Sequence, residues 1–416
     1  MTTTHNNKLY DPKTQDLSFG RLISTNIAVK FQVDIINQIF NPFLTIIAAG
    51  LGVNVVTLGQ LLSLRSLVGV CTPFIGALAD RMGYRAMIRL CLLLTAMGSA
   101  FIGISTNFIM ATIGLLLTGI GTAGFVPVIH AYSSAYLPYE KRARGMGIIE
   151  YSWALAGIIG LPIMGVAINW YGWRTPFFLL AAGLLVAWLI FGWMPEAKQQ
   201  PEVEGEAAKS ASYRSTSLQM LIKFFDLGNN ARSAYCAIFA QGFTFFAAMQ
   251  LTIAYGPWFT TEYQLTSVQL GQVALVVGCF DLIGSVSVSL FTDRIGKRLS
   301  VLIGNIGMLI GFILLPWLNI GIYSAVFSLA FIRGVFEFGI VSGFPLLSEQ
   351  VEGQPGKVLS LGSTTVWIAG AVASLTGPWL YVNYGVNTIC IISSVSVCFA
   401  ILLLFVGVQD SVIERH

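Results

Sequence analysis

Apolar residues run in long windows along almost the whole chain, and short polar segments separate the windows. A helix that crosses the hydrocarbon core of a membrane needs about 20 mostly apolar residues. Windows of this length lie near 27–49, 56–79, 87–105, 108–136, 145–169, 175–194, 233–260, 267–290, 299–318, 322–349, 358–382 and 388–408. The pattern predicts an all-α membrane protein with twelve transmembrane helices.

Composition agrees with a chain that has lipid as its solvent. Of the 416 residues, 55% are hydrophobic and 10% are charged, whereas soluble domains carry about 25% charged residues. The sequence has no HExxH, no Gly-x-Ser-x-Gly and no P-loop, and its six cysteines form no metal-ligand spacing. We expect no enzyme, no bound cofactor or metal, and no nucleic-acid partner.

The basic residues predict the orientation in the membrane. The first 25 residues lack the apolar core and cleavage site of a signal peptide, so we expect a cytoplasmic N-terminus. With that orientation, 19 of the 23 Lys and Arg residues fall on the cytoplasmic side, and Arg174 alone falls in an outer loop. Both termini are therefore predicted to face the cytoplasm, with the chain in a bacterial inner membrane.

A polar stretch divides the chain near its middle. Residues 195–217 are polar and poor in aromatic residues, which is typical of a flexible tether or a disordered linker. A surface helix near 218–227 is a further possibility. The predicted organisation is a tail at 1–25, six-helix bundles at 26–194 and 231–409, a linker at 195–230 and a second tail at 410–416.

The two predicted bundles repeat each other at one offset. Asp80, Arg81, Gly83 and Arg85 follow the second window, and Asp, Arg, Gly and Arg recur 213 residues later after the eighth window. A Tyr-Gly pair after the fifth window also recurs 213 residues later, after the eleventh. This indicates two related halves arranged as parallel repeats about an axis normal to the membrane.

The first copy of this loop resembles the signature loop of the major facilitator superfamily. The pattern Gly76-x-x-x-Asp80-Arg81-x-Gly83-x-Arg85 matches, although Tyr84 stands where a basic residue is usual and Ser289 replaces the leading Gly of the second copy. The resemblance implies a cytoplasmic gate formed by Gly76, Asp80, Arg81, Gly83, Arg85, Asp293, Arg294, Gly296 and Arg298. A membrane anchor made by positive charge alone is the plainer interpretation.

Ionisable residues within the windows are costly in lipid and are candidate functional residues. The central ones are Asp34, Arg65, Asp281, Arg333 and Glu337. Their depths suggest that Asp34 can pair with Arg65, and the i, i+4 spacing suggests that Arg333 can pair with Glu337. The functional interpretation is a proton and substrate site between the halves, and the alternative is a set of buried ion pairs that never titrate.

Three further ionisable residues lie nearer the cytoplasmic ends of the windows. We expect Lys30 to extend its ammonium group to the membrane surface, since it lies closer to that end than Asp34. His130 is interpreted as a packed, hydrogen-bonded residue, with proton relay as the alternative. Glu150, like Glu349, suits a hydrated position or a gate pair.

The fifth window carries a glycine- and proline-rich motif at Gly157, Gly160, Pro162 and Gly165. It is similar to the signature of the drug–proton antiporter branch, where it seals the helix against a partner and is associated with export. Here Leu161 interrupts the usual Gly-Pro pair. The branch's usual Arg in the fourth window is also absent, although Arg333 precedes a Gly in the tenth.

Aromatic and amide side chains in the windows are candidate walls of a substrate cavity, which suits an amphipathic organic solute. They are Asn37, Gln38, Trp153, Phe245, Phe246, Gln250, Tyr255, Trp258 and Trp367. Aromatic side chains that simply face lipid are the alternative interpretation.

The sequence thus favours a secondary transporter that exports a small organic, amphipathic or drug-like solute by proton antiport. A proton-coupled symporter that imports a sugar, organic acid or other nutrient is the main alternative. A membrane sensor on the same scaffold is a third, but the sequence has no soluble domain large enough to signal. The expected partners are the solute, protons and the lipid bilayer, with the protein as a monomer and the proton gradient as its energy source.

Overall fold

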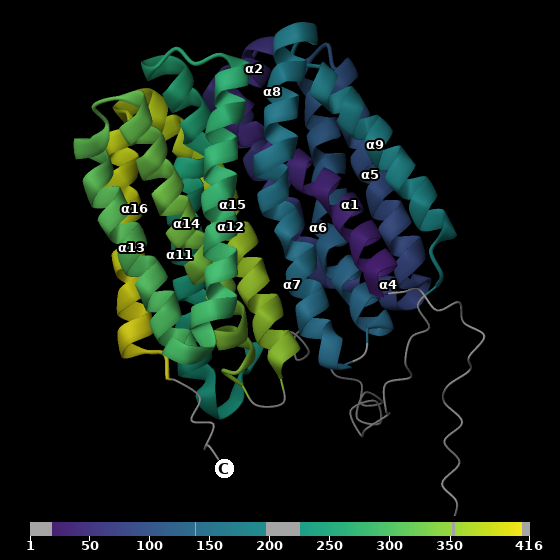
Figure 1. Ribbon diagram of the computed structural model, residues 1–416, viewed down its shortest axis with the longest axis vertical. Coiled ribbons are helices and arrows are strands. Elements are labelled where there is room, and N and C mark those ends of the chain that lie inside the picture. The colour runs from purple at the N-terminus through teal and green to yellow at the C-terminus, as the bar shows by residue number, and fades with distance from the viewer. Residues whose placement is uncertain (1–18, 138, 197–224, 352–353, 410–416) are drawn as a thin grey trace, which may run out of the picture.

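The computed structural model describes residues 19–137, 139–196, 225–351 and 354–409; within them, the side chains of residues 73–74, 76–77, 80, 139–144, 229 and 355 are excluded. All regular elements in these ranges are helices (Figure 1). The first half contains α1 Phe19–Gln38, α2 Phe40–Gly50, α3 Val55–Leu67, η1 Val68–Cys71, α4 Thr72–Met82, α5 Tyr84–Ile104, α6 Phe108–Tyr136, α7 Tyr139–Leu155, η2 Ala156–Gly160, α8 Leu161–Tyr171 and α9 Thr175–Trp193.

The second half contains six long helices after a short turn. They are preceded by η4 Gly228–Asn230 and comprise α11 Ala231–Glu262, α12 Ser267–Ile295, α13 Lys297–Leu318, α14 Ile322–Ser348, α15 Pro355–Tyr384 and α16 Val386–Val406. The predicted linker lies mostly outside the described residues, as does most of the suggested surface helix near 218–227. In Figure 1 the two sets of helices stand side by side, α1–α9 on one side and α11–α16 on the other.

Ten of the described helical segments are long and apolar enough to cross a membrane, and the bent pair α1–α2 makes an eleventh. The predicted second span is divided into α3, η1 and α4, so only the shorter apolar segment Val55–Cys71 is recognised there. Pro73, the second residue of α4, has no backbone N–H to donate, which accounts for a break in helical hydrogen bonding at this point.

Two local breaks shape the middle of the first half. The axes of α1 and α2 differ by 56°, and Pro42 lies just after the bend, where it cannot donate to the carbonyl of Gln38. Residues Ala156–Gly160 form a π-helical turn that ends two residues before Pro162. Such turns place an extra residue in the helix and commonly occur at functional sites.

Glycines with positive φ repeat the 213-residue offset in backbone conformation. Gly83 and Gly296 have φ of 89° and 101°, and Gly172 and Gly385 have φ of 88° and 77°. Each separates two helices, and a residue with a Cβ atom would be strained there. The internal repeat in the sequence is therefore also a repeat of tight turns.

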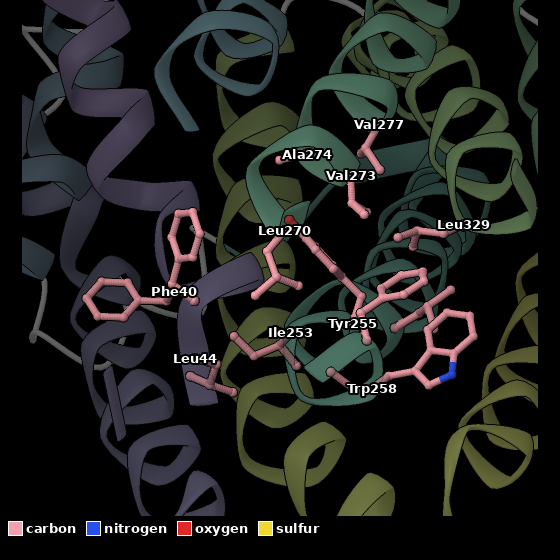
Figure 2. Close-up of a cluster of buried hydrophobic side chains, with 14 of the residues drawn as sticks. Phe40, Leu44, Ile253, Tyr255, Trp258, Leu270, Val273, Ala274, Val277 and Leu329 are labelled. Atoms are coloured by element: carbon pink, nitrogen blue, oxygen red, sulfur yellow. The ribbon is translucent and has the colours of Figure 1, made fainter. Parts of the chain in front are cut away.

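The buried core is shared between the halves at one end of the molecule and divided at the other. One cluster joins residues of both halves; Figure 2 shows Phe40 and Leu44 of α2 near Ile253 of α11 and Leu270 of α12. A second cluster lies wholly in the first half, and a third wholly in the second half. The separate clusters include the start of α1, the end of α9 and the end of α16.

Contacts between the halves follow the same division. Helix α12 packs against α7, η2, α8 and α2, helix α11 packs against α2, and helix α15 packs against α3 and η1. In Figure 1 the labels of α2 and α8 lie at the top, whereas α4 lies toward the bottom, near the lower end of α1. The halves are thus sealed together toward the end that carries α2 and α8.

Candidate functional site between the two halves

A small cavity lies where the halves meet, and both halves line it. Its empty volume is about 310 Å³, which includes the part that is open to solvent. The first half supplies residues from the α1–α2 bend, α7 and α8, and the second half supplies residues from α11, α12 and α14. They are Gln38, Asn41, Trp153, Leu161, Thr252, Tyr255, Ala274, Val277, Gly278, Asp281 and Arg333.

A buried ion pair forms one wall of this cavity. The Nη2 of Arg333 on α14 donates to Oδ2 of Asp281 on α12 at 2.8 Å, and each residue is 3% exposed. The Oδ1 of Asp281 and the Nε and Nη1 of Arg333 have no hydrogen-bond partner in the described part of the chain. The pair therefore neutralises charge while leaving strong donors and one acceptor unused, which is costly for buried groups.

The expected pairing of Arg333 with Glu337 is not found. Instead, Arg333 reaches across to Asp281, and Oε1 of Glu337 accepts a hydrogen bond from Ser285 of α12 at 3.0 Å. The guanidinium also lies 4.9 Å from the ring centroid of Phe336. Because α12 and α14 pack side by side, a partner on the neighbouring helix replaces the one on the same helix.

A second cluster of charges lies in the first half. The Nζ of Lys30 is 3.0 Å from Oδ2 of Asp34, and this oxygen also accepts from Ser152 of α7 at 2.6 Å. Lys30 is 2% exposed and Asp34 is 1% exposed. The expectation that Lys30 reaches the membrane surface is therefore wrong: its ammonium group is held by partners in the protein interior.

This cluster continues toward solvent through α7 and α6. Lys30 Nζ is also 3.1 Å from Oε2 of Glu150, whose side chain is 47% exposed. The other oxygen of Glu150 lies 2.7 Å from Nε2 of His130 on α6. A continuous series of titratable groups thus connects the buried Asp34 to an exposed carboxylate, an arrangement able to relay protons.

Arg65 does not pair with Asp34, contrary to the suggestion from depth. Its Nη2 donates to Oδ1 of Asn37 at 2.5 Å, and the threonines Thr118 and Thr122 of α6 lie 3.3 and 3.4 Å from its Nε and Nη2. The described ion pairs include none with Arg65. Helix α3 therefore brings a cation among neutral oxygens, and Asp34 faces α7 instead.

The other candidate cavity residues divide into two sets. Gln38, Trp153 and Tyr255 line the cavity, and Nε2 of Gln38 donates to the Trp153 carbonyl at 2.9 Å. The remainder are in contacts elsewhere. Three of them have hydrogen-bond partners elsewhere: Asn37 accepts from Arg65, Gln250 donates to Thr376, and Trp258 donates to Glu262. The other three are aromatic: Phe245 contacts the ring of Phe336, Trp367 lies against Gly69, and Phe246 is half-buried.

Close glycine contacts join α8 and its preceding turn to other helices. A Cβ atom on Gly278 of α12 would lie 2.8 Å from the backbone nitrogen of Ile158, and one on Gly271 would lie 2.9 Å from Cα of Pro162. Gly157 and Gly165 also face α12, whereas Gly160 faces Ile35 of α1. The predicted helix-five seal thus lies at the interface between the halves.

The described gate residues contact their own half of the molecule. Arg85 donates to the carbonyl of Met194 at the end of α9, and Arg298 donates to the carbonyls of Leu404 and Phe405 at the end of α16. Arg81, Asp293 and Arg294 are exposed, Gly83 and Gly296 form turns, and the side-chain positions of Gly76 and Asp80 lie outside the description.

Several site residues were not among the sequence candidates. Asn41 and Thr252 line the cavity, and Ser152 binds Asp34. Asn41 precedes Pro42, and that proline is a signal in the sequence that could have drawn attention to it, whereas Ser152 and Thr252 are ordinary residues of membrane helices. In the described ranges, no three His, Cys, Asp or Glu side chains gather as a metal site would require.

Comparison with known proteins identifies relatives over most of the chain. The family model of the Major Facilitator Superfamily matches residues 28–288 and 237–415. An MFS-type transporter of Bacillus subtilis named YceJ is 24% identical, with 85% of this chain and 87% of the relative covered. The sialic acid transporter NanX of Escherichia coli is 23% identical, with 80% of each chain covered. The multidrug resistance protein MdtG of Proteus mirabilis is 24% identical over 80% of this chain and 81% of its own.

Solved structures share the fold at low sequence identity. A D-xylose-proton symporter aligns with a TM-score of 0.75 and 18% identity over 94% of this chain and 97% of its own. A POT family transporter aligns with a TM-score of 0.76 and 14% identity over 93% of this chain and 96% of its own. The predicted all-α transporter fold is confirmed, and these relatives are transporters rather than enzymes.

Proposed function

This chain belongs to the major facilitator superfamily, and from that premise we propose that it moves a small organic solute across a membrane by proton-coupled alternating access. Membership of the superfamily identifies the protein as a multi-pass membrane transporter.

The observation that carries the proposal is the cavity between the halves with titratable groups on both sides of it. Asp281 lines the cavity itself, and the Lys30–Asp34 pair lies on α1, the helix that leads into Gln38. Charged groups are expensive in a membrane interior and are retained where an ion, a proton or a substrate must bind. A carboxylate with a cationic partner can exchange that partner for a proton or a solute.

The divided core supports a conformation that is open toward one side of the membrane. The halves share a core near α2 and α8, whereas each has its own core near the start of α1 and the end of α16. If both termini are cytoplasmic, as the basic residues predict, this is the inward-facing conformation. We further propose an inner-membrane location and a monomer.

Export by antiport is the first candidate for direction. Gly157, Pro162 and Gly165 pack closely against α12 across the interface, as the resemblance to the drug–proton antiporter branch implies. A relative named as a multidrug resistance protein also supports it. In this scheme the proton and the solute bind alternately, so the inward proton gradient drives the solute outward.

Co-transport with protons is a second candidate, which one observation favours. Arg333 has unused donors beside Asp281 in the cavity, and such donors suit a solute that carries an acidic group. A relative named as a sialic acid transporter supports this alternative.

The test is flux in liposomes that contain the full chain under an imposed pH gradient of either direction. Cationic, anionic and neutral solutes are each assayed with wild type, Asp34→Asn and Asp281→Asn. Asp226→Asn serves as the control, because Asp226 is an exposed carboxylate that accepts from the backbone N–H of Gly228. We expect proton-driven flux of at least one solute, lost in the two Asp variants and kept in the control. No proton-linked flux in wild type, or equal flux in all four proteins, overturns the proposal.

A further inference from the structure

We propose that the solute of this transporter is a small organic anion whose carboxylate binds Arg333 in the cavity between the halves, and that its binding brings a proton onto Asp281. This inference rests on the proposed transport function and names the class of solute for the same cavity. It also selects between the two candidate directions of coupling.

Arg333 has hydrogen-bond donors that nothing in the described structure uses. The guanidinium gives one hydrogen bond to Asp281 through Nη2, while Nε and Nη1 have no partner in the described part of the chain. Arg333 is 3% exposed and lines the cavity. A guanidinium presents a planar fork of donors that matches the two oxygens of a carboxylate, so the missing partner is best supplied by that group.

The geometry of the fork links the solute to a proton. Each pair of donors that can grip a carboxylate with two hydrogen bonds includes Nη2, the nitrogen already bound by Asp281. A bound carboxylate therefore shares this nitrogen with Asp281, and two negative charges meet beside buried side chains. Like charges at such a distance cannot both stay ionised at little cost, so one group takes up a proton.

Asp281 is the group assigned to accept that proton. The charged and titratable groups around it are Arg333 and Glu337 on α14 and Tyr255 on α11, with Glu150 of α7 acting on Glu337 from the first half. Asp281 binds the same nitrogen that the solute takes, and its Oδ1 has no partner in the described structure, whereas the printed hydrogen bond of Glu337 comes from Ser285. Once protonated, Asp281 is neutral and carries an O–H donor of its own. The charge of Arg333 then neutralises the carboxylate of the solute.

Neutral polar groups on the remaining walls suit the body of a polar anion. Gln38 and Asn41 come from the α1–α2 bend, and Thr252 and Tyr255 come from α11. Figure 2 shows the Tyr255 ring extending toward Leu270 and Ala274 of α12, the helix that also carries Asp281. Hydroxyl and amide groups on the solute can bind here.

Arg65 supports the same charge preference in the other half. It is a half-buried cation whose hydrogen bonds go to Asn37, Thr118 and Thr122, and no carboxylate pairs with it among the described residues. Asn37 is adjacent in sequence to Gln38 of the cavity. An uncompensated guanidinium raises the local positive potential, which favours an anion over an amine.

The first experiment measures binding to the purified full chain by thermal shift. The probes are sugar acids, hydroxybenzoates and N-acetylamino acids, each with its primary amide as the uncharged match. We expect at least one carboxylate to raise Tm while its amide does not. Arg333→Gln should weaken this binding at least tenfold, Arg333→Lys less, and Asp226→Asn not at all. The melting temperature without probe reports whether each variant folds.

The second experiment measures proton uptake with a pH indicator in weakly buffered solution. Wild type should take up about one proton for each carboxylate bound, whereas Asp281→Asn should bind the carboxylate without taking up a proton. If Arg333 and Asp281 formed a purely structural ion pair, Asp281→Asn would not change the number of protons taken up and Arg333→Gln would not change carboxylate affinity. Binding of amides or amines alone, binding of no carboxylate, unchanged affinity in Arg333→Gln, or proton uptake by Asp281→Asn equal to wild type overturns the inference.

The two proposals fail in different ways. Proton-driven flux of neutral or cationic solutes, without carboxylate binding, removes this inference and leaves the proposed function standing. Carboxylate binding with proton uptake, but without flux in liposomes, removes the proposed function and leaves the anion site. Flux of a carboxylate in the same direction as protons supports both and favours co-transport over export by antiport.

Discussion

The two halves of the molecule contain buried ion pairs that differ in how completely they are satisfied. In the first half, Asp34 has Lys30 and Ser152 as partners, and Lys30 continues to the exposed Glu150. In the second half, Arg333 and Asp281 bind each other once and leave three polar atoms without partners in the described part of the chain. The first cluster thus extends from a buried carboxylate to an exposed one, whereas the second keeps unused hydrogen-bonding atoms beside the cavity.

The internal repeat does not extend to these charges. The residue 213 positions after Asp34 is Ala247, and the residue 213 positions before Asp281 is Val68. The tight turns at Gly83 and Gly296 do repeat. The repeat therefore preserves the connections between helices, whereas the buried charges differ between the two halves.

The largest expected loss of thermal stability comes from breaking the Lys30–Asp34 ion pair. Replacing Lys30 by Met leaves Asp34 buried and without its cation, and removing one partner of a buried pair costs about 3–5 kcal/mol. We expect a large drop in thermal stability of the purified protein, and we expect Lys30→Met with Asp34→Leu to recover most of it. An equal loss in the single and double variants would contradict the interpretation that Asp34 depends on Lys30.

A comparison of single variants in the two halves sharpens the contrast. Arg333 already has unused donors, so we expect Asp281→Asn, which retains a hydrogen-bonding side chain, to cost less stability than Lys30→Met. Thermal unfolding of both variants under one set of conditions checks this order. The reverse order would show that the second pair is the more important structural one.

A smaller effect is expected at the seal between the halves. A Cβ atom on Gly278 would lie 2.8 Å from a backbone atom of the η2–α8 region, and overpacking of this kind costs about 1–3 kcal/mol. Gly278→Ala should lower thermal stability and proton-driven flux together. Gly147→Ala is the matched control, because a Cβ atom there meets nothing within 4 Å; equal effects in both variants would argue against a seal.

The smallest effect is expected for an arginine contact that both halves share. Arg85 and Arg298 each donate to carbonyls at the end of the last helix of their half. A cation at a helix C-terminus contributes about 0.3–1 kcal/mol. Arg85→Gln and Arg298→Gln should therefore lower thermal stability slightly and by similar amounts. A tenfold loss of flux in either variant would instead indicate the gate that the family resemblance implies.

Partner choice was the least predictable part of the candidate site. The depths of Asp34 and Arg65 were estimated from helix ends, but depth does not give the rotation of a helix about its axis. Asp34 faces Ser152 on α7, and Arg65 faces α6. The spacing of Arg333 and Glu337 allowed a pair on one helix, yet the close packing of α12 and α14 brought Asp281 within 2.8 Å of Arg333.

The sequence alone determined the helical membrane class and the internal repeat, because these depend on the length of the apolar windows and on residue identities along the chain. It did not reveal that the second window is divided into α3, η1 and α4. It also identified Asp281, Arg333, Gln38, Trp153 and Tyr255 as candidates, since polar groups are conspicuous among apolar residues. Only the tertiary structure decided which of them share a cavity and which donors remain unused, because those facts depend on how helices far apart in the chain pack against one another.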